Sequence, residues 1–151
     1  MVSNKFLEVV NILLVEDNSG DIRLTQEALK ESKIAINLHI VNDGVEAMEF
    51  LRKKGKFENK IRPDVVILDL NLPKKDGREV LEEIKQDKTL KTIPIVILTS
   101  SEAERDILKA YNLYANCYIK KPLDIDQFIM IVQSIAHFWF SIVKLPPHGC
   151  D

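Results

Sequence analysis

The stretch Val65–Leu70, VVILDL, is a continuous apolar run broken by a single aspartate. Two further runs have the same form, NILLV at Asn11–Val15 and IVILT at Ile95–Thr99. Apolar runs that do not alternate with polar residues are typical of strands buried on both faces, as in a parallel sheet. Weaker runs at Leu38–Val41 and Cys117–Lys120 bring the expected number of strands to five.

Amphipathic segments with a helical period separate these runs. They cover residues 21–32, 44–54, 77–86 and 102–111, and a last one starts at residue 124. Four of them open with an N-cap residue followed three residues later by Glu or Gln: Asp43/Glu46, Asp76/Glu79, Ser101/Glu104 and Asp124/Gln127. We therefore predict an α/β protein of (βα)5 form, a doubly wound five-stranded parallel sheet. Its functional residues should lie beyond the carboxyl ends of the strands.

The composition is that of one globular domain. Of the 151 residues, 46% are hydrophobic and 29% are charged, and the formal net charge is −2. A nearly neutral chain lacks broad attraction for nucleic acid or an anionic membrane, so we expect neither as a partner. The cysteines have no metal-site spacing, and neither a signal peptide nor a membrane-spanning apolar stretch is present. We expect a cytoplasmic location.

The expected strand ends bring reactive side chains to one edge of the sheet: Glu16 and Asp17, Asp69, Thr99, and the lysine pair 120–121. Most of them also have a plain structural explanation, such as capping of the first helix by Asp17. Asp69 is harder to explain, because a carboxylate in a buried strand is costly unless it is paired or binds a cation. Converging carboxylates repel one another, and a hard divalent cation such as Mg²⁺ relieves that repulsion best.

An acidic metal pocket with a free carboxylate, a hydroxyl and an ammonium group contains the parts for phosphoryl transfer onto an aspartate. The metal and the lysine would neutralise phosphoryl oxygens while the carboxylate attacks in line. The sequence has neither GxGxxG nor GxxxxGK, the glycine-rich loops that hold nucleotide phosphates. A nucleotide-binding enzyme is therefore disfavoured.

Four motifs occur in a fixed order along the chain: VEDN (15–18), LDLNLPKKDG (68–77), ILTSS (97–101) and YIKKP (118–122). As a set they resemble the response-regulator receiver domains of two-component signalling, over about residues 11–136. The resemblance implies a flavodoxin-like receiver fold. It also implies a protein that accepts a phosphoryl group from a histidine kinase in a Mg²⁺-dependent reaction and turns over no external substrate.

The resemblance also assigns a role to each matching position. Asp69 would be the phosphoacceptor, Thr99 the hydroxyl switch, Tyr118 the aromatic switch and Lys121 the phosphate-binding lysine. The metal would be held by Asp17, Asp69 and the backbone carbonyl of Asn71, with Glu16 acting through water. A cis bond between Lys121 and Pro122 would turn the lysine into the pocket. Lys121 is preferred to Lys120 because adjacent strand side chains point to opposite faces and the family's lysine directly precedes the proline.

Stretches near both ends of the chain resemble a narrower group within the receiver family. VEDNSGDIRLTQEAL (15–29) and FWFSIVKLPP (138–147) are similar to stand-alone receivers that serve bacterial phytochrome histidine kinases. This likeness implies a phytochrome as the partner kinase and light as the input.

Two other functions use the same fold. A pseudo-receiver would act only as a docking module, but the acidic pair, Asp69, Thr99 and Lys121 are all intact. A phosphatase with an aspartyl nucleophile needs a second carboxylate two residues after it, where this chain has Asn71. The docking module is therefore the alternative to a phosphorylated receiver.

The last amphipathic segment is too apolar for a helix with one buried face. Ile125, Phe128, Ile129, Val132 and Ala136 form the stripe expected to cover the sheet. A second stripe consists of Ile131, Phe138, Ile142 and Leu145. It would either mediate a symmetric homodimer, which we favour, or fold back over the body of the protein. We expect one receiver domain over residues 1–145 and a flexible tail over 146–151.

The homodimer is tested by charging the second stripe. The double substitution Phe138→Glu and Ile142→Glu should give a soluble monomer, because two carboxylates cannot be buried in an apolar interface. Sedimentation analysis measures the outcome, and an intact dimer would contradict the assignment of this surface.

Overall fold

A computed structural model describes residues 9–31, 35–121 and 124–138. Its five parallel strands form one sheet in the order β2-β1-β3-β4-β5. The strands are β1 (Val10–Val15), β2 (Ile36–Val41), β3 (Val65–Asp69), β4 (Ile95–Thr99) and β5 (Cys117–Lys120). The central position of β1, β3 and β4 explains their unbroken apolar runs, because side chains on both faces of these strands are buried.

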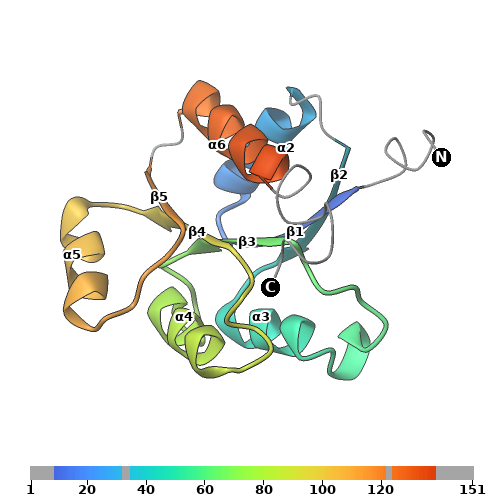
Figure 1. Cartoon of the computed structure of the whole chain (residues 1–151), viewed down its shortest axis with the longest axis vertical. Coiled ribbons are helices and arrows are strands. Elements are labelled where there is room, and N and C mark those ends of the chain that lie inside the picture. The colour runs from blue at the N-terminus through green and yellow to red at the C-terminus, as the bar shows by residue number, and fades with distance from the viewer. Residues whose placement is uncertain (1–8, 32–34, 122–123, 139–151) are drawn as a thin grey trace.

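Helices cover both faces of the sheet (Figure 1). They are α2 (Ser19–Glu31), α3 (Gly44–Leu51), α4 (Gly77–Gln86), α5 (Glu102–Ala110) and α6 (Ile125–Phe138), with a short 3₁₀ turn η1 (Gly55–Phe57). Helices α2 and α6 pack together on one face, whereas α3 and α4 lie on the other (Figure 1). The predicted doubly wound (βα)5 architecture is confirmed.

Two separate hydrophobic clusters fill the two sides of the sheet. One joins alternate residues of the central strands to α3, α4 and α5, and includes Leu68, Ile84 and Leu108. The other joins the intervening residues to α2 and α6, and includes Ile67 and Phe128. The sheet is therefore held from both faces, which fixes the positions of its strand ends.

The predicted helix starts are confirmed by hydrogen bonds from backbone to side chain. The N–H of Glu46 donates to Asp43 Oδ1 at 2.8 Å, and the N–H of Glu79 donates to Asp76 Oδ1 at 3.0 Å. Ser101 and Asp124 cap α5 and α6 in the same way. Helix α2 starts two residues earlier than predicted, at Ser19, with Asn18 Oδ1 accepting from the N–H of Asp21 at 2.9 Å.

The prediction for the outward stripe of the C-terminal helix differs from the structure at one residue. Ile131, expected on the outward stripe, is partly buried and packs against the cluster of α2 and α6. It lies one turn after the fully buried Phe128, so its side chain falls at the edge of the covered face. Ile142 and Leu145 lie outside the described residues, as does the predicted tail 146–151, and the side chain of Phe138 is not described. Among the described residues, no helix is long and apolar enough to span a membrane.

Two glycines allow the loop after β3 to pack tightly. A Cβ on Gly44, at the start of α3, would overlap the backbone carbonyl of Lys75. A Cβ on Gly77 would overlap the backbone carbonyl of Asp69. Backbone atoms leave no room for a side chain at either position, so these glycines fix the loop that follows the aspartate of β3.

Gly44→Ala should lower the free energy of unfolding by about 1–3 kcal/mol, because the added methyl group displaces the Lys75 backbone. Gly20→Ala is the matched control, since its Cβ would meet only Asn18 Oδ1, at 3.2 Å, near the start of another helix. Its effect should stay below about 1 kcal/mol. Urea unfolding measures both, and equal effects would contradict the close approach at Gly44.

Candidate functional site

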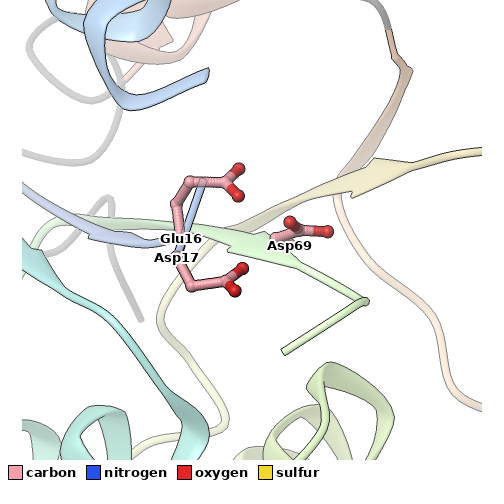
Figure 2. Close-up of side chains that lie close together, drawn as sticks. All are labelled: Glu16, Asp17 and Asp69. Carbon is pink, nitrogen blue, oxygen red and sulfur yellow. The ribbon is translucent and has the colours of Figure 1, made fainter. Parts of the chain in front are cut away.

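Three carboxylates converge at the carboxyl ends of β1 and β3. Glu16 and Asp17 follow β1, and Asp69 is the last residue of β3. Each offers an oxygen, and these oxygens lie within 4.8 Å of one another. The carboxylates of Glu16 and Asp17 extend from β1 toward Asp69 (Figure 2). Glu16 and Asp69 are 0% and 2% exposed, whereas Asp17 is exposed.

The ammonium group of Lys121 lies among these carboxylates. Its Nζ is 2.8 Å from Asp69 Oδ2 and 3.1 Å from Glu16 Oε1. The residue directly follows β5, and its backbone N–H donates to the carbonyl of Thr99 at 2.7 Å. Lys120 is exposed. The structure thus places Lys121 in the cluster, as the position before Pro122 predicted.

One carboxylate that the sequence reasoning did not select also contacts Lys121. Asp21, in the first turn of α2, places Oδ2 2.7 Å from the ammonium nitrogen. An acidic residue in the first turn of a helix has an ordinary explanation in the favourable interaction with the helix N-terminus. For that reason no signal in the sequence assigned Asp21 to the site.

Burial and neighbouring charges shift the pKa values of two groups of the cluster, Glu16 and Lys121. Burial raises the pKa of Glu16 to about 7, and the hydrogen bond and negative charge of Asp69 add to this effect against the opposing charge of Lys121. Burial alone would lower the pKa of Lys121, but its contacts with Asp21, Asp69 and Glu16 outweigh burial and raise it. Glu16 Oε1 is buried and forms an ion pair with Lys121 at 3.1 Å, but it accepts no hydrogen bond from the described residues, because the ammonium donates to Oε2. One ammonium group therefore leaves part of the negative charge uncompensated.

Backbone groups orient two of the carboxylates. The N–H of Asn71 donates to Asp69 Oδ1 at 3.0 Å, and the N–H of Asn18 donates to Glu16 Oε2 at 3.2 Å. The side-chain amide of Asn71 donates to Ser100 Oγ at 2.7 Å, which joins the loops after β3 and β4. Asn71 therefore lies beside Asp69, where its carbonyl was predicted to face a metal.

The two predicted switch residues lie on neighbouring strands. Thr99 ends β4 and is 3% exposed. Tyr118, on β5, is partly buried, and its hydroxyl accepts a hydrogen bond from the N–H of Ala115 at 3.0 Å. The guanidinium carbon of Arg105 lies 4.8 Å from the centre of its ring. Pro122 lies outside the described residues, so the cis bond before it stays a prediction.

The donor set fits a hard divalent cation. Glu16, Asp17 and Asp69 supply only oxygen ligands, which are the ligands that Mg²⁺ and Mn²⁺ prefer. A cation placed among them would also balance the charge that Lys121 leaves uncompensated. The observation that supports this fit is Glu16 Oε1, which is buried and accepts no hydrogen bond from the described residues although the Lys121 ammonium lies 3.1 Å away.

A family model described as the response regulator receiver domain matches residues 12–133. The chain belongs to this family. Response regulators are signalling proteins, and receiver domains bind a divalent metal ion, in agreement with the acidic cluster. The five-stranded doubly wound sheet is the receiver fold.

Similar proteins cover nearly the whole chain. "Response regulator Rcp1" of Synechocystis sp. is 52% identical over 135 residues, which are 89% of this chain and 92% of that protein. The solved structure of the "Phosphorylated Cyanobacterial Phytochrome Response Regulator RcpA" is 52% identical, with a TM-score of 0.76 over 92% of this chain and 99% of that one. "Bacteriophytochrome response regulator RtBRR" is 38% identical, with a TM-score of 0.80 over 94% of this chain and 87% of that one. A solved Mn²⁺-bound form of Rcp1 is 51% identical, with a TM-score of 0.74 over 91% of this chain and 99% of that one.

The raised pKa of Glu16 makes the metal-free protein sensitive to pH. The folded state favours the protonated carboxyl, so the stability that Glu16 contributes is complete below about pH 4.5 and is lost as the pH rises through about 7. Glu16→Gln cannot ionise. The free energy of unfolding of this variant relative to wild type should therefore increase by about 1–3 kcal/mol between pH 5 and pH 8.

Urea unfolding in the presence of a chelator measures this difference at both pH values. Glu49→Gln, at an exposed position of α3, is the matched control and should show no such trend. Millimolar Mg²⁺ should stabilise wild type at pH 8 more than it stabilises Glu16→Gln. A difference between variant and wild type that does not change with pH would contradict the raised pKa.

Proposed function

We propose that this response regulator accepts a phosphoryl group on Asp69 from a sensor histidine kinase. The observation that carries this proposal is the environment of Asp69. Its buried carboxylate lies at the end of β3, 2.8 Å from the Lys121 ammonium, and two further carboxylates have oxygens within 4.8 Å of it. Such a site offers a nucleophile, the positive charge of Lys121 and oxygen ligands for a metal ion that would add further positive charge.

In the transfer, a carboxylate oxygen of Asp69 attacks the phosphorus of a phosphohistidine. The new O–P bond forms as the P–N bond breaks, and the imidazole leaves with the electron pair of that bond. The residues that would hold Mg²⁺ are Asp17, Asp69 and the Asn71 carbonyl, with Glu16 acting through water. When bound, the metal would neutralise charge on the phosphoryl oxygens.

Lys121 provides the second positive charge. In the unphosphorylated state its ammonium group is paired with Asp69 Oδ2. Phosphorylation adds negative charge on the same side, so this contact passes to a phosphoryl oxygen. The chain itself moves little for this exchange, because the lysine backbone is anchored to Thr99.

Thr99 and Tyr118 would convert the added charge into a change of surface. The Thr99 hydroxyl donates to a phosphoryl oxygen and moves toward Asp69, and the Tyr118 ring fills the space that this leaves. Tyr118 starts from a defined position, hydrogen-bonded to Ala115 and stacked with Arg105 of α5. Movement of the ring therefore biases the surface formed by α5, β5 and α6.

The input we propose is light, received by a phytochrome histidine kinase. Support comes from the similarity to RcpA, a cyanobacterial phytochrome response regulator, and RtBRR, a bacteriophytochrome response regulator, which cover at least 92% of this chain. We further propose a cytoplasmic protein that forms a homodimer through the C-terminal stripe of Ile131, Phe138, Ile142 and Leu145, to which Ile131 contributes the part of its side chain that stays exposed. Because Asn71 stands two residues after Asp69, where phosphatases with an aspartyl nucleophile carry a second carboxylate, we expect no turnover of external phosphate esters.

The proposal predicts one phosphoryl adduct on Asp69. Incubation with a small acyl-phosphate donor should add a single phosphoryl mass in the presence of Mg²⁺ and none after chelation, as measured by intact-protein mass spectrometry. Asp69→Asn should abolish the adduct, because the amide is not a nucleophile. Asp106→Asn, at an exposed position of α5, is the matched control and should retain it. Absence of the adduct in folded wild type would favour a docking module without phosphorylation.

A further inference from the structure

We propose that Asp21 is a positioning residue that competes with the phosphoryl group for Lys121, and so favours metal binding over phosphoryl binding. This inference rests on the proposed phosphorylation of Asp69 and concerns the regulation of the same site. It is carried by the 2.7 Å contact between Asp21 and the Lys121 ammonium group.

The three N–H groups of the Lys121 ammonium all face carboxylates. They donate to Asp21 Oδ2 at 2.7 Å, Asp69 Oδ2 at 2.8 Å and Glu16 Oε2 at 3.3 Å. No further N–H remains for a phosphoryl oxygen, since an ammonium group has only three. A phosphoryl group on Asp69 must therefore share this lysine with the carboxylates that already hold it.

The backbone of Asp21 is anchored at the start of α2 by two hydrogen bonds. Its backbone N–H donates to Asn18 Oδ1, and its carbonyl accepts from the hydroxyl of the buried Thr25, both at 2.9 Å. Its side chain is 22% exposed, whereas those of Glu16 and Asp69 are almost fully buried. The anchored start of helix α2 thus places the Asp21 carboxylate beside the lysine.

The main effect of Asp21 on the site is its negative charge, and its contribution to holding Lys121 in place is smaller. Lys121 is already held by its backbone bond to Thr99 and by the two buried carboxylates. A carboxylate at 2.7 Å instead offsets the positive charge of the ammonium group. The site becomes more attractive to a divalent cation, which Lys121 would otherwise repel. It becomes less attractive to a phosphoryl group, which needs that positive charge.

Removal of the Asp21 charge should therefore change two affinities in opposite directions. In Asp21→Asn, Mg²⁺ should bind about three- to ten-fold more weakly, and beryllofluoride, a stable analogue of the phosphoryl group, about three- to ten-fold more tightly. Calorimetry measures the Mg²⁺ affinity, and ¹⁹F NMR titration at saturating Mg²⁺ measures the beryllofluoride affinity. Damage to the fold would weaken the binding of both Mg²⁺ and beryllofluoride. Weaker Mg²⁺ binding together with tighter beryllofluoride binding therefore identifies the effect of the charge.

Further variants separate charge from contact. Asp21→Ala, which also removes the hydrogen-bond acceptor, should shift both affinities in the same directions as Asp21→Asn. Asp21→Glu should return them toward the wild-type values. Glu27→Gln removes a charge from an exposed position of the same helix and should leave both unchanged. The differences should also shrink at high ionic strength, because Asp21 is partly exposed.

Weaker beryllofluoride binding in Asp21→Asn and Asp21→Ala would overturn the inference and assign Asp21 a purely supporting role. Unchanged affinities would overturn it as well. Either result would leave the proposed function intact, provided that wild type binds beryllofluoride and Asp69→Asn does not. Wild type that fails to bind beryllofluoride would instead overturn the proposed function, and this inference with it.

Discussion

The candidate site depends on a lysine ammonium group that lies among carboxylates at the edge of a parallel sheet. Lys121 contacts Asp69, Glu16 and Asp21 at 2.7–3.1 Å, and two of these carboxylates are buried. Removing carboxylates from water is costly, and one ammonium group cannot balance all of them. The same imbalance that destabilises the metal-free site makes it receptive to a divalent cation.

The fold provides the rigidity that such a cluster requires. Strands β1, β3 and β5 each deliver one part of it, and two hydrophobic clusters hold the sheet from both faces. Close packing of the loop after β3, permitted by Gly44 and Gly77, fixes the backbone next to Asp69. The stability supplied by the apolar layers therefore offsets the free-energy cost of burying carboxylates at the edge of the sheet. Such an arrangement is common at functional sites.

Much of this was predictable from the sequence, because the signals were local. Apolar runs without alternation identified the buried strands, side-chain caps marked four helix starts, and Asp69 stood out as a carboxylate inside a buried run. The contact between Asp21 and Lys121 was not predictable, since an acidic first helical turn is ordinary and none of the four receiver motifs contains Asp21. The partial burial of Ile131 was missed because helical period alone does not say how wide a covered face is.

The central claim is that the Lys121 contact passes from the Asp69 carboxylate to the phosphoryl group. A crystal structure of the protein with Mg²⁺ and beryllofluoride tests it directly. The account predicts beryllium bonded to an Asp69 oxygen, Mg²⁺ coordinated by Asp17 and Asp69, and the Lys121 ammonium within hydrogen-bond distance of a fluorine atom. An Asp69 carboxylate that stays unmodified and paired with Lys121, with beryllofluoride bound elsewhere or absent, would contradict it.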